Sequence, residues 1–179
     1  MKHVSTFAKY LGRKLRREDG NASVEFVILF PAIMTIFFSS FEVSIYLLRA
    51  TMLERALDLN VRELRLGRLD PATPEQLKKQ VCDDTLIFRD CPNAIAIELT
   101  TISTNTWELP AESMVCVDRR EEIAPAVTVD FGQVNDLMMV RACAVLDPFF
   151  GTTSLVMDLP LDPSGGYVVA AASTFVNEP

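Results

Sequence analysis

The sequence has very little histidine, with His3 as the single example among 179 residues. Histidine-based catalytic triads and histidine-ligated metal sites are therefore excluded from residues 21–179. The chain also lacks a Walker A loop, a GxGxxG fingerprint and a GxSxG nucleophile elbow. We predict no cofactor, no metal and no catalytic residue, so an enzyme is the least favoured class of function.

Basic charge is scarce outside the first 20 residues. These residues hold six basic and two acidic groups, whereas residues 21–179 hold 11 basic and 22 acidic groups, a net charge of −11. Such an acidic segment is a poor candidate for binding nucleic acid or anionic lipid. We therefore expect no nucleic-acid partner.

A long, mostly apolar run is present at residues 26–48, with Glu42 as its one charged residue. As a helix, these 23 residues extend ~34 Å, enough for the ~30 Å hydrocarbon core of a bilayer. A cleaved secretory signal is the main alternative, but the run has no small-x-small cleavage site. A single membrane anchor is the favoured interpretation, with lipid as a partner.

Two carboxylates accompany this run, and each has an ordinary and a functional explanation. Glu25 precedes the run, where a charge costs free energy unless it reaches the headgroups or finds a partner. Glu42 lies close enough to the end of the run for solvation at the interface, and a partner contact is an equal alternative. Pro31 removes one helical N–H, which predicts a kink in the helix. A flexible point is the functional alternative.

Basic residues flank the run on both sides, which gives only a slight preference for a cytoplasmic N-terminus. All four cysteines follow the run, which favours an oxidising compartment such as the periplasm. Their spacings match no common zinc pattern, so two disulfides are predicted and three connectivities are possible. We favour the sequence-local pairs, Cys82 with Cys91 and Cys116 with Cys143.

The remaining pattern predicts an α+β protein. A helix continues to about residue 66, first apolar all round and then amphipathic, with Gly67 as its C-cap. Thr73 and Pro74 indicate the start of a short helix that runs to about residue 86. Alternating or apolar runs predict strands at residues 94–102, 137–146 and 166–176. We expect a small antiparallel sheet against the long helix.

Residues 20–31, Glu42, the helix that follows and residues 65–68 together resemble the TadE/TadF-like minor pseudopilins of tight-adherence (Flp, type IV-like) pilus systems. The resemblance implies a basic leader at residues 1–20, a transmembrane and amphipathic helix at residues 21–68, and a periplasmic α+β domain at residues 69–179. It also implies that a prepilin peptidase cuts between Gly20 and Asn21.

By the same resemblance, Glu25 and Phe26 serve peptidase recognition or assembly. The expected partners are the prepilin peptidase, other pilins or pseudopilins, and the inner-membrane assembly platform. A neighbouring subunit's Glu25 is expected to pair with the new ammonium group of Asn21. The alternative function is an uncleaved single-span protein that presents an acidic periplasmic binding domain.

Overall fold

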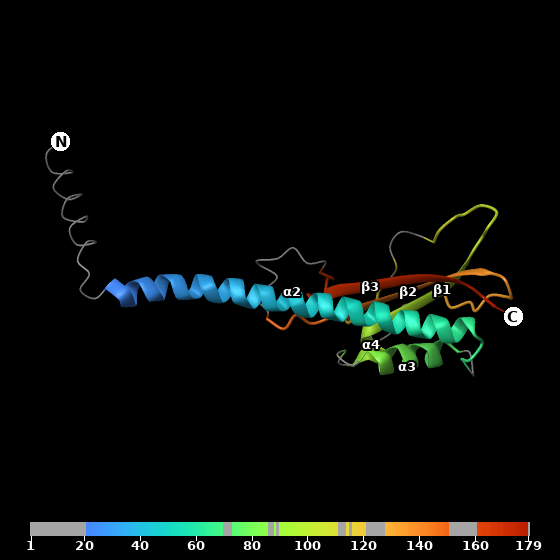
Figure 1. The fold of residues 1–179 in the computed structure, drawn as a ribbon, viewed down its shortest axis with the longest axis horizontal. Coiled ribbons are helices and arrows are strands. Elements are labelled where there is room, and N and C mark those ends of the chain that lie inside the picture. Colours follow the sequence, from blue (N-terminus) through green and yellow to red (C-terminus); the bar gives the residue numbers. More distant parts are fainter. Residues whose placement is uncertain are drawn as a thin grey trace. The chain divides into compact units, whose positions relative to one another are not determined.

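The structure is a computed structural model that describes residues 21–69, 73–85, 88, 90–110, 114, 116–120, 128–150 and 161–178. Its described elements are the helices α2 (Asn21–Arg65), α3 (Pro74–Asp84) and α4 (Cys91–Ala94) and the strands β1 (Ile95–Ile102), β2 (Leu137–Leu146) and β3 (Tyr167–Val176). The three strands form one antiparallel sheet in the order β1-β2-β3 (Figure 1). The predicted α+β fold is confirmed, and all three predicted strands are present.

Two compact units divide the chain, and the second begins at Glu42 and ends at Pro179. In the first unit, residues 22–41 of α2 expose nearly all of their side chains. Within the described residues, α2 is the one helix long and apolar enough to cross a membrane. The predicted single membrane anchor therefore has a matching helix.

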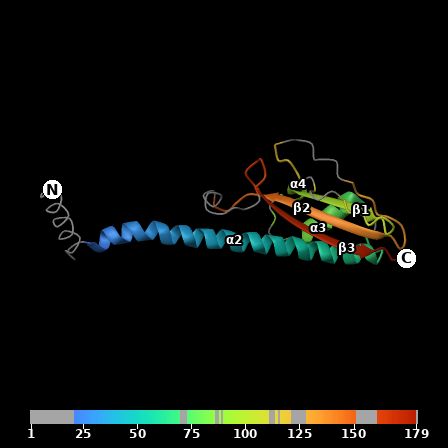
Figure 2. The ribbon, with the colours of Figure 1, turned by 90° about the horizontal axis from the view of Figure 1, so that it is seen from above.

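The second unit is held together by a core between the rest of α2, α3 and one face of the sheet. Figure 2 shows the three strands side by side, with the C-terminal part of α2 running alongside β3. The predicted apolar stripe of α2 lies in this core, through buried residues at an i, i+3, i+4 spacing: Leu53, Ala56, Leu57, Asn60, Val61 and Leu64.

The sheet contributes alternate residues to the core because successive side chains of a strand point to opposite faces. On β1 these are Ile95, Ile97 and Leu99, which the register places opposite Ala144, Ala142 and Val140 of β2. Tyr167 and Val169 of β3 continue the same face. The other face carries Glu98 directly opposite Arg141, and these side chains form a largely buried ion pair.

Local signals end and begin the helices as the sequence predicts. Gly67 has a φ of +62°, a conformation that glycine adopts without steric cost. The N–H of Gly67 donates to the Leu64 carbonyl and the N–H of Arg68 to the Glu63 carbonyl, the two bonds of a Schellman motif. At the start of α3, the Thr73 side chain accepts a hydrogen bond from the Gln76 N–H at 3.2 Å.

Two features of the second unit were not predicted. The short helix α4 precedes β1 in a segment that carries no clear periodic pattern. Residues 128–130 also lie beside β1, where the Leu99 N–H donates to the Thr128 carbonyl and the Asp130 N–H donates to the Leu99 carbonyl. The outer edge of β1 is therefore partly paired, by a segment for which the sequence predicts no strand.

Candidate functional site

The first part of the candidate site is the start of α2. Gly20 lies outside the described residues, and Asn21 is the first residue of α2. Glu25 and Phe26 are both exposed, and the Phe26 ring lies 5.0 Å from the Phe30 ring one turn later. A contact of Glu25 with a neighbouring subunit stays a prediction.

Pro31 lies inside α2, which continues through it. Downstream hydroxyl groups satisfy exposed carbonyl groups of the same helix. The Thr35 hydroxyl donates to the Pro31 carbonyl at 2.7 Å, and Ser39 does the same to Thr35 at 2.8 Å. Such bonds are one way in which membrane helices satisfy polar groups without water. The kink at Pro31 stays a prediction.

The second part of the candidate site is Glu42, whose side chain is fully buried. Its carboxylate accepts hydrogen bonds from two successive backbone N–H groups of the loop after β2. The Phe149 N–H lies 3.0 Å from both carboxylate oxygens, and the Phe150 N–H lies 2.9 Å from Oε2. The structure differs from simple solvation of Glu42 at the interface, because the carboxylate is buried and bonded to a loop of its own chain. A contact of Glu42 with another protein stays a prediction.

Arg49 fixes the same loop from two turns further along α2, on the same face of the helix. Its Nη1 donates to the Asp147 carbonyl at 3.0 Å and also to the Tyr167 hydroxyl. The guanidinium carbon lies 5.5 Å from the centre of the Tyr167 ring, and this ring contacts that of Tyr46 edge to face. Glu42 and Arg49 together fasten residues 147–150, which we name the Phe149 loop, to α2.

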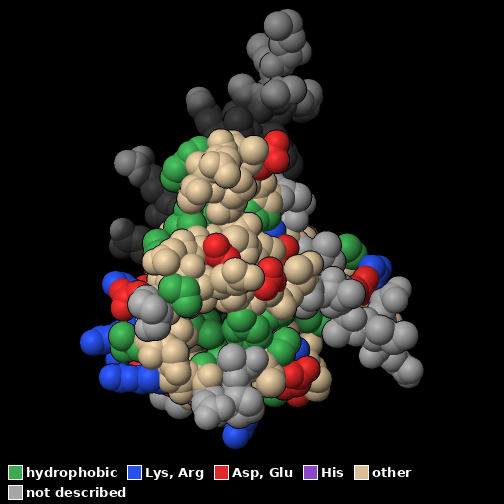
Figure 3. Space-filling model, turned by 90° about the vertical axis from the view of Figure 1, so that its right-hand side faces the viewer, with side chains coloured by type: hydrophobic (Ala, Val, Ile, Leu, Met, Phe, Trp, Pro, Cys, Tyr) green, Lys and Arg blue, Asp and Glu red, His purple; other side chains and the backbone are tan. Residues whose placement is uncertain are grey.

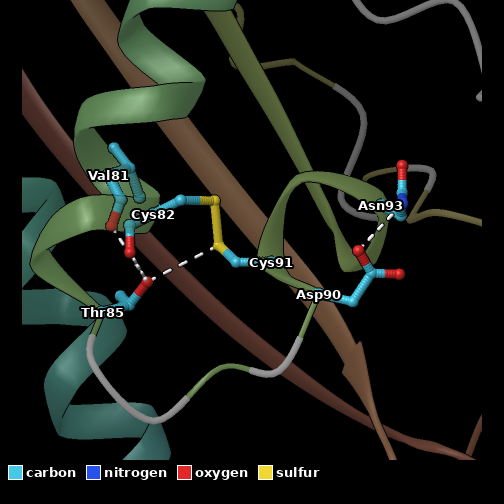
Figure 4. Close-up of a disulfide and its surroundings, with 6 residues drawn as sticks. All are labelled: Val81, Cys82, Thr85, Asp90, Cys91 and Asn93. Atoms are coloured by element: carbon cyan, nitrogen blue, oxygen red, sulfur yellow. Dashed lines mark hydrogen bonds between the residues drawn. A yellow bond between two sulfur atoms is a disulfide. The ribbon is translucent and has the colours of Figure 1, made fainter.

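The cysteines form two disulfides in the structure, Cys82–Cys91 and Cys116–Cys143, with Cα–Cα distances of 5.6 and 5.7 Å. This is the sequence-local pairing favoured above. The first bridge joins α3 to α4 (Figure 4). Beside it, the Thr85 hydroxyl donates to the carbonyls of Val81 and Cys82 and lies 3.6 Å from the Cys91 sulfur.

No group of three or more histidine, cysteine or acidic residues suited to a metal ion occurs among the described residues. The Arg120 guanidinium lowers the pKa of the exposed Asp118 carboxyl to about 2, and partial burial lowers the pKa of Lys78. Figure 3 shows charged side chains of both signs around exposed hydrophobic side chains on one face of the molecule.

These features define a class of protein in which, over the described residues, one apolar helix long enough to span a bilayer continues into a disulfide-bonded α+β unit. Comparison with protein families assigns the N-terminal region more closely. The family model described as "TadE-like protein" matches residues 20–58, so this region of the chain is TadE-like. Searches of curated proteins and of solved structures gave no match.

The match spans Gly20, Glu25, Pro31, Glu42 and Arg49. The match agrees with the resemblance drawn from the sequence and is consistent with a protein associated with tight-adherence pili. The TadE-like family is typically structural rather than catalytic. Sequence reasoning missed Arg49 and the Phe149 loop. The seven-residue spacing of Glu42 and Arg49 on one apolar helix was a usable signal, but it did not identify their partners.

Proposed function

We propose that this chain is a minor pseudopilin or pilus-assembly protein of a tight-adherence system. The observation that carries the proposal is the TadE-like match, which begins at residue 20 and covers the membrane helix. In this proposal, a prepilin peptidase cuts between Gly20 and Asn21 on the cytoplasmic side. The mature chain stays anchored in the inner membrane with residues 69–179 in the periplasm.

Physical arguments support the cleavage site. Gly20 has no side chain, which allows a protease to approach the backbone closely. Glu25 follows in the second turn of α2, close to the positive end of the helix dipole. After cleavage, the ammonium group of Asn21 becomes available to Glu25 of a neighbouring subunit. This pairing offsets part of the cost of placing either charge in a helical bundle within the membrane.

The role in this proposal is structural, and the partners are the peptidase, other pilins or pseudopilins and the assembly platform. The two disulfides suit a domain in an oxidising compartment, because thiols in the cytosol are kept reduced. The chain then presents its second unit on the periplasmic side, where it joins or primes a thin pilus.

Processing tests the proposal directly. The chain is produced in cells with and without the cognate peptidase, and its N-terminus is read by intact-mass spectrometry of the membrane fraction. We expect a mature chain that begins Asn21-Ala-Ser-Val-Glu25 when the peptidase is present. Gly20→Leu is expected to block the cut by crowding the scissile backbone, whereas Gly67→Ala, a matched glycine change elsewhere, leaves processing intact.

Retention of Met1 in cells that carry the peptidase would contradict the proposal. That result would favour the alternative, an uncleaved single-span protein that presents an acidic periplasmic binding domain.

A further inference from the structure

The Phe149 loop carries an aromatic pair, of which Phe149 is exposed and Phe150 is half-buried. The Phe149 side chain is 61% exposed, although phenylalanine is among the residues most often buried in proteins. Its ring lies 5.2 Å from the Phe150 ring at an interplanar angle of 72°. The loop follows β2 directly, so the strand and the contacts with α2 hold its beginning in place.

The position of this loop along α2 is fixed by the hydrogen bonds of Glu42 and Arg49. Glu42 accepts from the backbone of both phenylalanines and Arg49 donates to Asp147, so the loop is held at both of its ends. A buried carboxylate needs such partners, because burial removes its hydration. The cost of burying Glu42 is therefore offset only when the Phe149 loop lies against this turn of the helix.

That turn of the helix coincides with the end of the exposed apolar segment. Residues 21–41 are 21 residues of helix, which extend ~31 Å and match the ~30 Å hydrocarbon core. The second compact unit begins at the next residue, Glu42. The apolar run alone predicts a span of residues 26–48, which ends at Leu48. If residues 21–25 also lie in the hydrocarbon core, residues 21–41 suffice to cross it and residues 42–48 lie outside.

We propose that the Phe149 loop docks on the lipid bilayer that α2 crosses, with the Phe149 ring at the boundary between headgroups and acyl chains. Aromatic side chains on surface-bound segments favour this depth, because the ring leaves water while the backbone stays near polar groups. Glu42 is the positioning residue that holds the loop at this height. The proposal rests on membrane anchoring by α2 and not on cleavage or on a role in pili.

Lipid is favoured over a protein partner because Glu42, which holds the loop, directly follows the apolar segment 21–41 in the chain. Asp147 at the start of the loop is 80% exposed at its side chain, and residues 21–179 carry a net charge of −11, so attraction to anionic headgroups is not the driving force. We therefore expect docking on zwitterionic lipid, insensitive to salt, because burial of apolar rings in the interface requires no charge.

The test uses the full chain in nanodiscs of phosphatidylcholine, one chain per disc, with and without lipids brominated on the acyl chains. Bromine quenches a nearby indole. In a Trp107→Phe background, Phe149→Trp places the only indole in the loop. We expect blue-shifted emission and a loss of intensity in brominated lipid. The native Trp107, 66% exposed in another loop, is the matched control and is expected to stay unquenched.

Two further variants separate the possible failures. Phe38→Trp, in the segment that crosses the membrane, must be quenched if α2 spans the bilayer, and the absence of quenching there overturns the anchoring itself. Quenching of Phe38→Trp without quenching of Phe149→Trp overturns the docking of the loop alone. If the Phe149→Trp emission shifts to the blue only with two chains per disc, the ring is covered by a second copy of the chain. That result overturns lipid as the partner of the loop.

The positioning role of Glu42 has its own measurement. Adding Glu42→Gln to Phe149→Trp weakens the hydrogen bonds that hold the loop, so it is expected to reduce quenching and to shift it toward shallower bromine positions. Glu54→Gln, an exposed glutamate on the same helix, is expected to change neither. Both disulfides must remain intact in the variants compared. Unchanged depth in Glu42→Gln overturns the positioning role.

Discussion

Removing the two disulfides one at a time is expected to destabilise the second unit by unequal amounts. The bridge Cys82–Cys91 spans 9 residues and Cys116–Cys143 spans 27. A crosslink restricts the unfolded chain more when it closes a longer loop. The chain-entropy relation then gives ~2.6 kcal/mol for the short loop and ~3.6 kcal/mol for the long loop.

The assay is urea unfolding of the full chain in detergent micelles, followed by pulse proteolysis of the unfolded fraction. The double variants are Cys82→Ala with Cys91→Ala, and Cys116→Ala with Cys143→Ala. With a urea dependence of ~2 kcal/mol per molar, their midpoints fall by ~1.3 M and ~1.8 M. Adding reductant to either variant is expected to lower the midpoint again, because the other bridge is then lost.

The larger loss is expected for the long loop, and this order distinguishes the loop-entropy explanation from others. Cys91 and Cys143 are both nearly fully buried, so each double variant also removes one buried sulfur and this cost is similar in the two. Equal midpoints, or a larger loss from the short loop, would refute the loop-entropy reasoning. Unchanged midpoints together with four free thiols in protein recovered from the envelope would refute the disulfides themselves.

Two further predictions concern ionic contacts. Arg141→Met is expected to cost ~3–5 kcal/mol in the free energy of unfolding, because it leaves the largely buried Glu98 without its cation. Adding Glu98→Leu is expected to recover most of this loss. Urea midpoints of the wild type and of the single and double variants check this, and equal stability of the single and double variants would contradict it. Asp118 is expected to titrate at about 2 rather than at its ordinary 3.8, so its contact with Arg120 persists at neutral pH and is lost only as the pH falls through about 2. Arg120→Ala raises the pKa toward 3.8 in an NMR titration of the carboxyl carbon, and an unchanged pKa would show that the arginine is not its cause.

Much of the fold follows from periodicity in the sequence. The stripe from Leu53 to Leu64 predicts the buried face of α2, and Gly67 and Thr73 mark helix ends through hydrogen bonds made within a few residues. The strands can be predicted because their apolar runs are long and bounded by turn residues. These signals are local, so one sequence suffices to read them.

The contacts of Glu42 were not predictable in the same way. Its partners, the N–H groups of Phe149 and Phe150, lie more than 100 residues along the chain and are backbone groups that any residue provides. Their proximity depends on the register of β2 and on how the sheet meets α2. The pairing of residues 128–130 with β1 was missed for the same reason, since one short bridge has no periodic pattern.

Glu25→Leu tests most directly whether this chain functions in pilus assembly at the membrane. A photo-crosslinking side chain is placed at Val24 in cells that carry the complete pilus system, and crosslinks to pilus partners are compared with and without the substitution. Removing an acidic group from the edge of an apolar run does not weaken insertion, so the variant is expected to remain anchored.

In Glu25→Leu, the crosslinks and the pili are expected to be lost while the protein stays in the membrane. Glu54→Leu, the matched change on the exposed face of α2, is expected to have no effect. Normal piliation together with undiminished crosslinking in Glu25→Leu would contradict the account.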